Sequence, residues 1–148
     1  MPPAPTTVNV PLRWSDMDAY GHVNNTEFVR LLEEARVAGW HEWFGDAKAL
    51  ELGIVVARHE IDYLAQLGHR REPVAVDIWV SRLGGAGYDL GYIVRDPDGV
   101  GAGTRYAVAE TSLALFDFAA GRPRRMTEHE RATLGAHLGD PAPLRRRR

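Results

Sequence analysis

The spacing of apolar residues changes near residue 25, and the change separates two kinds of element. Over residues 8–14 apolar and polar or small positions alternate, which predicts a short first strand reaching about Trp14. From Asn25 onward the apolar positions follow the 3.6-residue helical period: Phe28, Leu31, Leu32, Ala35 and Gly39. This spacing predicts an amphipathic helix from Asn25 to about Phe44.

After Gly53 the chain is strand-like almost throughout, with a helical turn expected just before it, over 47–52. Thr127 is expected to cap a final helix over Glu128–Leu138. The last two strands of the chain are joined by Asp96-Pro97-Asp98-Gly99, a strong turn signal because Pro presets φ and Gly accepts a positive φ. The four predicted strands are Ile54–Leu64, Pro73–Leu83, Tyr88–Arg95 and Thr104–Phe118.

The order of these elements predicts an α+β architecture. Short hairpin loops require antiparallel neighbours, and a single helix with one apolar stripe needs a sheet to cover it. We therefore expect an antiparallel sheet of five to six strands wrapped around one long central helix. Such a sheet has edge strands that pairing with a second copy would protect, so a homodimer is the default expectation.

Length and composition narrow the class of protein. At 148 residues the chain is expected to form one domain over 1–148, with a core over 6–126, a C-terminal helix over 127–139 and a disordered tail over 140–148. A net charge of −2 gives no electrostatic case for a nucleic-acid partner, and the absence of cysteine excludes disulfides and thiolate chemistry. No signal peptide or membrane span is evident, so we expect a cytoplasmic protein without a membrane partner.

The candidate chemistry lies just before the long helix, in the stretch RWSDMDAYGHVNNTEFVRLLEEAR. Asn24 is a favoured N-cap residue, and Glu27, three positions on, is expected to reach back to it as a capping box. Val23 and Phe28 occupy the two positions of a hydrophobic staple. In this register the backbone N–H of Asn25 has no partner and points out of the positive end of the helix.

An unpaired N–H at a helix start favours developing negative charge, as an oxyanion hole does. Gly21 would allow a ligand close to the backbone, and the carboxylate of Asp18 is the best available nucleophile or base for acyl transfer. Two plainer interpretations stay open: Asp and Asn are ordinary turn and cap residues, and His22 is a common type of loop residue. A metal site formed by Asp16, Asp18 and His22 is a further alternative.

The motif Asp-x-Asp-x-x-Gly-His-Val-Asn-Asn, followed by a helix containing Leu-Glu-Glu-Ala-Arg, resembles the hotdog-fold thioesterases of the 4-hydroxybenzoyl-CoA thioesterase family. The long-chain acyl-CoA and plant acyl-ACP thioesterases carry a similar His-Val-Asn-Asn. The resemblance covers about residues 6–126. It implies a hotdog fold, a homodimer or homotetramer, and hydrolysis of an acyl-CoA to free CoA and a carboxylic acid. No cofactor is implied, since CoA is part of the substrate, and no metal.

The resemblance also implies roles for individual residues. Asp18 would act on the thioester as nucleophile or general base, and the backbone N–H of Asn25 would polarise the carbonyl, with Gly21 and His22 beside them. Some relatives hold the CoA phosphates with basic residues between the two middle strands, where this chain has the uncharged Gly84-Gly85-Ala86. Another arginine would have to substitute here: Arg82, Arg58, Arg122 or Arg124. A thioester on an acyl-carrier protein therefore stays possible as the substrate. The candidate substrate contacts are Asn24, Trp40 and Arg82.

The sequence also raises one other position for the catalytic carboxylate of a thioesterase and two other functions. One hotdog branch uses a carboxylate on the central helix, but Glu33 and Glu34 lie roughly 13 Å along the helix axis from Asn24. Hotdog enoyl-CoA hydratases use an aspartate and a histidine five residues apart on a loop after the helix, whereas Asp18 and His22 are four apart and precede it. A non-catalytic acyl-CoA-binding protein of the same fold is the third alternative.

Overall fold

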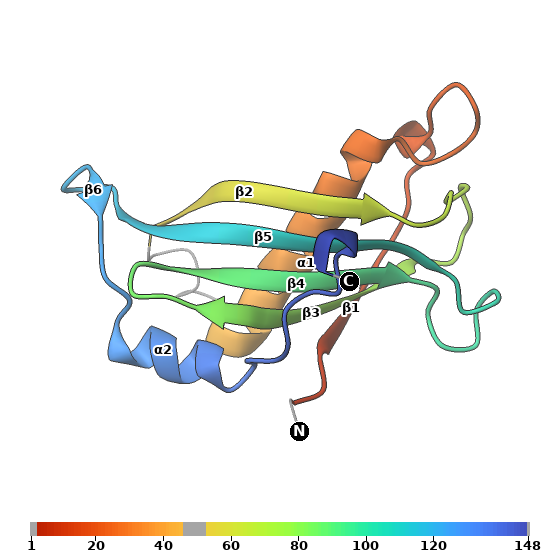
Figure 1. The fold of residues 1–148 in the computed structure, drawn as a ribbon. Helices are drawn as coiled ribbons and strands as arrows, with labels where there is room; N and C mark the ends of the chain where they lie inside the picture. Colours follow the sequence, from red (N-terminus) through yellow and green to blue (C-terminus); the bar gives the residue numbers. More distant parts are fainter. Residues whose placement is uncertain (1–2, 46–52, 148) are drawn as a thin grey trace.

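A computed structural model describes residues 3–45 and 53–147 of the chain. The helical turn expected over 47–52 lies outside the described residues. Figure 1 shows one long helix crossing a single curved sheet. The helices and strands, in chain order, are β1 (Thr6–Val10), a 3-10 turn (Trp14–Asp16), α1 (Asn25–Phe44), β2 (Ile54–Tyr63), β3 (Val74–Leu83), β4 (Gly87–Arg95), β5 (Arg105–Asp117), β6 (Arg122–Pro123), α2 (Glu128–Gly135) and a C-terminal 3-10 turn (Arg145–Arg147).

The sheet confirms the predicted α+β architecture. It has six strands, in the order β1-β3-β4-β5-β2 with β6 paired to β5, and all the neighbours are antiparallel. The helix prediction is confirmed at both ends, since α1 spans Asn25–Phe44. The first strand is shorter than predicted: β1 stops at Val10, directly before Pro11, and Trp14 belongs to a 3-10 turn. A proline has no N–H to continue the ladder.

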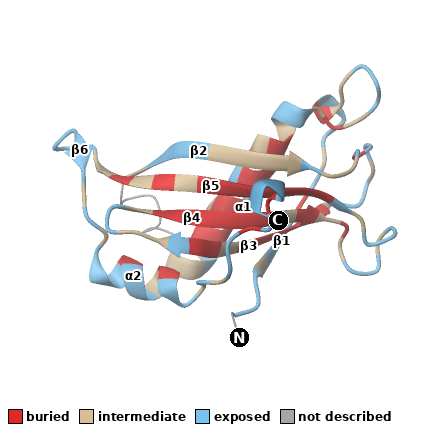
Figure 2. Ribbon diagram, in the orientation of Figure 1, coloured by how far each residue is buried: buried red, intermediate tan, exposed pale blue. Residues whose placement is uncertain are grey.

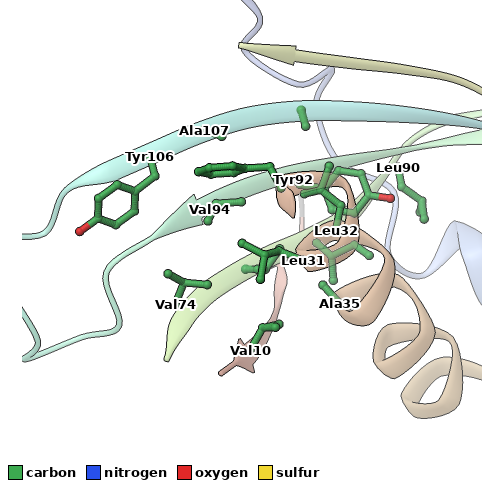
Figure 3. Close-up of a cluster of buried hydrophobic side chains, with 14 of the residues drawn as sticks. Val10, Leu31, Leu32, Ala35, Val74, Leu90, Tyr92, Val94, Tyr106 and Ala107 are labelled. Carbon is green, nitrogen blue, oxygen red and sulfur yellow. The ribbon is translucent and has the colours of Figure 1, made fainter. Parts of the chain in front are cut away.

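The core lies between α1 and the inner face of the sheet. Leu31, Leu32 and Ala35 of α1 are almost fully buried, as the helical period predicted. Figure 3 shows these side chains facing inward-pointing residues of the sheet, among them Val74 of β3 and Leu90 of β4. Burial is concentrated along the central strands and the face of α1 that meets them, whereas β2 is largely half-buried or exposed (Figure 2).

The C-terminal segment corrects one expectation. Residues 140–147 were predicted to form a disordered tail, yet they lie across the outer face of the sheet (Figure 1). Ala142 and Leu144 are almost fully buried there against Val108. The guanidinium of Arg147 donates to the buried carboxylate of Glu110 at 2.7 and 2.9 Å. Burial of Ala142 and Leu144, together with this ion pair, accounts for the order that the arginine run alone did not suggest.

Candidate active site

A cavity of about 560 Å³ lies where α1 begins, between the loop that precedes the helix and the end of β2. Three segments that are distant in sequence contribute to its wall: the loop 18–23, the first turn of α1, and residues 63–67. The lining residues are Asp18, Tyr20, His22, Val23, Asn25, Phe28, Tyr63, Ala65, Gln66 and Leu67. The sequence motif and the end of β2 therefore meet at one site.

The loop that carries Asp18 is folded back on itself as a small hairpin. Met17 bridges Val23, and the backbone N–H of Asp18 donates to the carbonyl of His22 at 2.8 Å. The turn is closed by the N–H of Gly21, which donates to the carbonyl of Asp18 at 3.2 Å. Gly21 has a φ of +76°, and a Cβ there would meet no atom within 4 Å. The glycine is therefore explained by its backbone conformation rather than by close packing.

The hairpin fixes one oxygen of the Asp18 carboxylate and leaves the other available. Oδ1 accepts hydrogen bonds from the backbone N–H groups of Tyr20, at 2.8 Å, and His22, at 3.2 Å. No hydrogen bond to Oδ2 is found within the described part of the chain. The Tyr20 contact is the turn interaction expected of an ordinary Asx residue. That role occupies Oδ1 only, and the half-buried side chain lines the cavity with Oδ2 left without a partner among the described residues.

The start of α1 follows the predicted register but not the predicted capping box. Asn24 is the N-cap, and its Oδ1 accepts the N–H of Thr26 at 3.1 Å. Glu27 does not reach back to Asn24: its carboxylate accepts hydrogen bonds from Arg13 at 3.2 Å and Arg30 at 3.3 Å. The two guanidinium groups outcompete a backbone amide for this carboxylate because charge-assisted bonds are the stronger ones. The Asn24 N–H donates instead to the carbonyl of Asp16 at 2.8 Å.

The backbone N–H of Asn25 has no hydrogen-bond partner among the described residues, whereas its two predecessors are paired. Val23 N–H donates to the carbonyl of Leu67 at 2.7 Å and Asn24 N–H donates to Asp16. Asn25 lines the cavity and is the first residue of α1. Its amide is therefore an unpaired donor at the positive end of a 20-residue helix, on a residue that lines the same cavity as Asp18.

The buried carboxylate of Asp16 anchors the loop that precedes α1, a role that the sequence did not predict. Its side chain is fully buried, and its two oxygens accept hydrogen bonds from Arg13 and from Arg30, the latter at 2.6 Å. Burial alone would raise the pKa of Asp16, but the bonds from Arg13 and the charge of Arg30 lower it below its ordinary value. The pairing of Asp16 with arginines accounts for both oxygens and disfavours the alternative in which it binds a metal with Asp18 and His22.

The remaining predicted residues lie at different distances from the cavity. His22 lines it, and the hydrogen bonds found for His22 use its backbone N–H and carbonyl. Asn24 is the helix cap next to it. Trp40 does not line it: its side chain is buried in the core, with the guanidinium of Arg36 over its ring. Glu34 pairs with Arg30 on the exposed side of α1.

Arg82 lies towards the other end of the sheet in this protomer. Its guanidinium pairs with Asp89, which is level with Ser112 on β5, whereas Tyr63 at the cavity is level with Ala107. Five positions along a strand correspond to roughly 17 Å. The structure therefore does not bring Arg82 together with Asp18. Across the described ranges, no group of three or more His, Asp or Glu side chains is arranged to hold a metal ion.

An antiparallel sheet wrapped around one long helix is the hotdog fold. The family comparison is specific: the model of the thioesterase-like superfamily matches residues 12–134, and the chain belongs to that superfamily. Membership supports thioester hydrolysis as the general class of reaction. No match was found among curated proteins.

Solved structures of thioesterases and candidate thioesterases resemble this chain over most of its length. The chain is similar to a thioesterase from Thermus thermophilus complexed with coenzyme A and zinc, at 30% identity over 93% of this chain and 97% of that one, with a TM-score of 0.76. A candidate thioesterase from Pseudomonas aeruginosa is 32% identical over 88% and 98% of the two chains, with a TM-score of 0.73. A candidate acyl-CoA thioesterase from Xanthomonas campestris is 28% identical over 84% and 100%, with a TM-score of 0.69.

None of the helices in the described ranges is both long enough and apolar enough to cross a membrane.

Proposed function

We propose that this protein is an acyl-CoA thioesterase of the 4-hydroxybenzoyl-CoA thioesterase-like type, which hydrolyses an acyl-CoA to free CoA and a carboxylic acid. One observation carries the proposal: Asp18 and Asn25 line the same cavity, and the backbone N–H of Asn25 has no partner among the described residues. A nucleophile and a donor for the carbonyl oxygen are the two parts that acyl transfer needs. The Thermus thermophilus relative bound to coenzyme A supports a CoA thioester as substrate.

In the proposed reaction Asp18 is the nucleophile. Its Oδ2 attacks the thioester carbonyl carbon, and the oxygen that becomes negative accepts a hydrogen bond from the Asn25 N–H. Collapse of this intermediate breaks the C–S bond and releases the CoA thiolate, which takes a proton from water. Water then hydrolyses the acyl-aspartyl anhydride, releases the acid and restores the carboxylate. All the groups required are side-chain and backbone groups of this chain.

Asp18 acting as a general base for water is the alternative role, and it would leave no covalent intermediate. The two are separated by stopping a single turnover with acid within milliseconds and measuring the mass of the protein. An increase equal to the acyl group on a peptide containing Asp18 supports the nucleophile. An unmodified protein throughout the turnover supports the base.

The proposed enzyme is a homodimer or homotetramer. Strand β2 forms one edge of the sheet, is ten residues long, and exposes Val55 and Val56. A long apolar edge strand is normally covered, and a second copy of the chain would cover it. Sedimentation analysis at micromolar concentration tests this directly, and a monomer at all concentrations would contradict it. A cytoplasmic location stays a prediction from the sequence.

The test of function is a panel of acyl-CoA thioesters with a colorimetric thiol readout. The chain has no cysteine, so every thiol detected comes from the substrate. We expect turnover of at least one acyl-CoA and a fall in kcat of about a hundredfold or more in Asp18→Asn, with the unfolding transition unchanged. Near-normal hydrolysis by that variant would remove Asp18 from the mechanism.

The same panel distinguishes the other candidates. Binding without turnover would indicate a non-catalytic acyl-CoA-binding protein. Loss of the enone absorbance of crotonyl-CoA would indicate a hydratase. Turnover of an acyl thioester on a carrier protein, but not on CoA, would change the substrate while leaving the chemistry unaltered.

A further inference from the structure

The carbonyl of Asn25, the cavity-lining residue whose N–H is unpaired among the described residues, accepts a hydrogen bond from a side chain of the sheet. The hydroxyl of Tyr63, the last residue of β2, donates a hydrogen bond to the Asn25 carbonyl oxygen at 2.9 Å. The ring of Tyr63 also packs edge-on against Phe28, with the centroids 5.3 Å apart and the planes at 87°. Both contacts join the end of β2 to the first turn of α1.

Three consecutive residues at the start of α1 are thus held by three different parts of the fold. Val23 is bonded to the segment after β2 through Leu67, and Asn24 is bonded to the carbonyl of Asp16. Asn25 is bonded through its carbonyl to Tyr63. The first two bonds join backbone to backbone. The third bond depends on the Tyr63 hydroxyl alone, so a single substitution can remove it without changing the backbone.

We propose that Tyr63 is a positioning residue for the reaction, and that its hydroxyl holds the first turn of α1 so that the Asn25 N–H meets the thioester oxygen. This inference rests on the proposed function, and it names a residue that the sequence motif does not contain. Helix ends fray when nothing holds them, and an oxyanion donor must stay within hydrogen-bond distance of the developing charge. A tyrosine hydroxyl is protonated and able to donate at neutral pH, and partial burial raises the pKa of Tyr63 further above its ordinary value.

The test compares Tyr63→Phe with the intact protein. Phenylalanine keeps the ring contact with Phe28 and removes only the hydroxyl. We expect kcat to fall about tenfold, because a displacement of one ångström or less already costs much of the advantage of correct geometry. We expect KM to change less than about twofold, since the cavity wall keeps its shape.

A second measurement does not depend on activity. The N–H of Val29 is bonded to the Asn25 carbonyl within the helix, so its hydrogen exchange reports fraying of the first turn. Loss of one neutral hydrogen bond should speed that exchange about fivefold in Tyr63→Phe. If kcat falls while the Val29 exchange rate is unchanged, the hydroxyl acts on the substrate directly and the positioning role is wrong. If KM rises while kcat is unchanged, Tyr63 only binds substrate and the proposal is overturned.

Tyr106→Phe is the matched control. The hydroxyl of Tyr106 donates to Asp96 at 2.6 Å, at the hairpin between β4 and β5, and it does not line the cavity. We expect this variant to lose stability and to keep the kcat of the intact protein. A tenfold fall in kcat for Tyr106→Phe as well would show that any lost tyrosine hydrogen bond has this effect, which overturns a specific role for Tyr63.

The outcome for Tyr63 is separable from that for the proposed function. If the intact protein hydrolyses no thioester in the panel, the function fails, and the Val29 exchange rate alone decides whether Tyr63 holds the helix start. If the intact protein is active, Asp18→Asn is inactive and Tyr63→Phe is fully active, the function stands and the positioning role fails.

Discussion

Replacement of Asn25 by proline offers a direct test of the proposed oxyanion donor, because it removes the backbone N–H together with a side chain whose own contribution Asn25→Ala measures. Proline is well tolerated at the first position of a helix, where the N–H has no intrahelical partner. Asn24 has φ −59° and ψ 138°, a conformation that the residue before a proline favours. The Asn25 N–H has no partner in the described structure, so its loss breaks no bond in the protein. The Asn25 carbonyl remains available to Tyr63.

The size of the effect follows from the exposure of the donor. Removing one oxyanion donor costs about 10²–10³ in kcat, or ~2.7–4 kcal/mol. Asn25 is exposed in the protomer and the cavity is open to solvent, so water can partly replace the missing donor. We therefore expect Asn25→Pro to lower kcat by about a hundredfold, at the lower end of that range.

Stability should not fall with activity. Proline at a compatible position leaves stability unchanged or raises it by up to about 1 kcal/mol, because the unfolded chain loses freedom. The assay is steady-state hydrolysis of the best acyl-CoA from the panel, together with urea unfolding of the same samples. Asn25→Ala keeps the N–H and is the matched control, with kcat expected within about threefold of the intact protein.

Two outcomes would refute this reasoning. If Asn25→Pro is folded and as active as Asn25→Ala, the amide does not stabilise the transition state. If both variants lose activity equally, the side chain of Asn25 is what matters, and the helix-start argument is wrong.

Two further predictions concern buried carboxylates. Asp16→Asn removes one of the two carboxylates that the largely buried Arg30 contacts at 2.6 Å, the other being Glu34, and should lower the free energy of unfolding by about 3 kcal/mol, measured as a lower urea midpoint at unchanged m; a shift below about 1 kcal/mol would contradict the anchoring role. Burial alone would raise the pKa of Asp96, but hydrogen bonds from Tyr106, Arg70 and the Thr104 N–H lower it to about 2. The contribution of Asp96 to the free energy of unfolding is therefore complete above the unfolded pKa of 3.8 and is lost as the pH falls towards 2. In Asp96→Asn the free energy of unfolding should therefore depend less on pH between about 4 and 2 than in the intact protein. Asp98→Asn, at a 99% exposed side chain in the same hairpin, is the control and should keep the full dependence. Equal slopes of stability against pH in the two variants would contradict the assignment to Asp96.

The sequence by itself determined the features that depend on neighbours along the chain. The period of the apolar residues predicted both ends of α1, and the strand-like runs after Gly53 predicted β2 to β5 to within a few residues. Asn24 as N-cap followed from residue type, and with it the unpaired amide of Asn25. Asp18 and Asn25 are seven positions apart with a tight turn between them, so a short-range pattern was sufficient to bring them to one site.

The tertiary structure decided everything that depends on residues far apart in sequence. Tyr63 and Leu67 reach the cavity only because β2 pairs with β5 and ends beside the start of α1, and no local pattern marks that ending as functional. Glu27 had the spacing of a capping box, but Arg13 and Arg30 converge on it in the fold. The helical period could place Trp40 on an apolar face without showing that this face meets the core rather than the cavity.

The outer face of the sheet shows the same limit. The segment over 140–147 was predicted to be disordered because its prolines and arginines have no periodic pattern. In the structure Ala142 and Leu144 pack against an apolar surface on the outer face of the sheet, and Arg147 forms an ion pair with Glu110. Local propensity is a short-range signal and specifies helices, strands and caps. Burial and charge pairing are long-range, and they come into being only when the register of the sheet brings distant residues together.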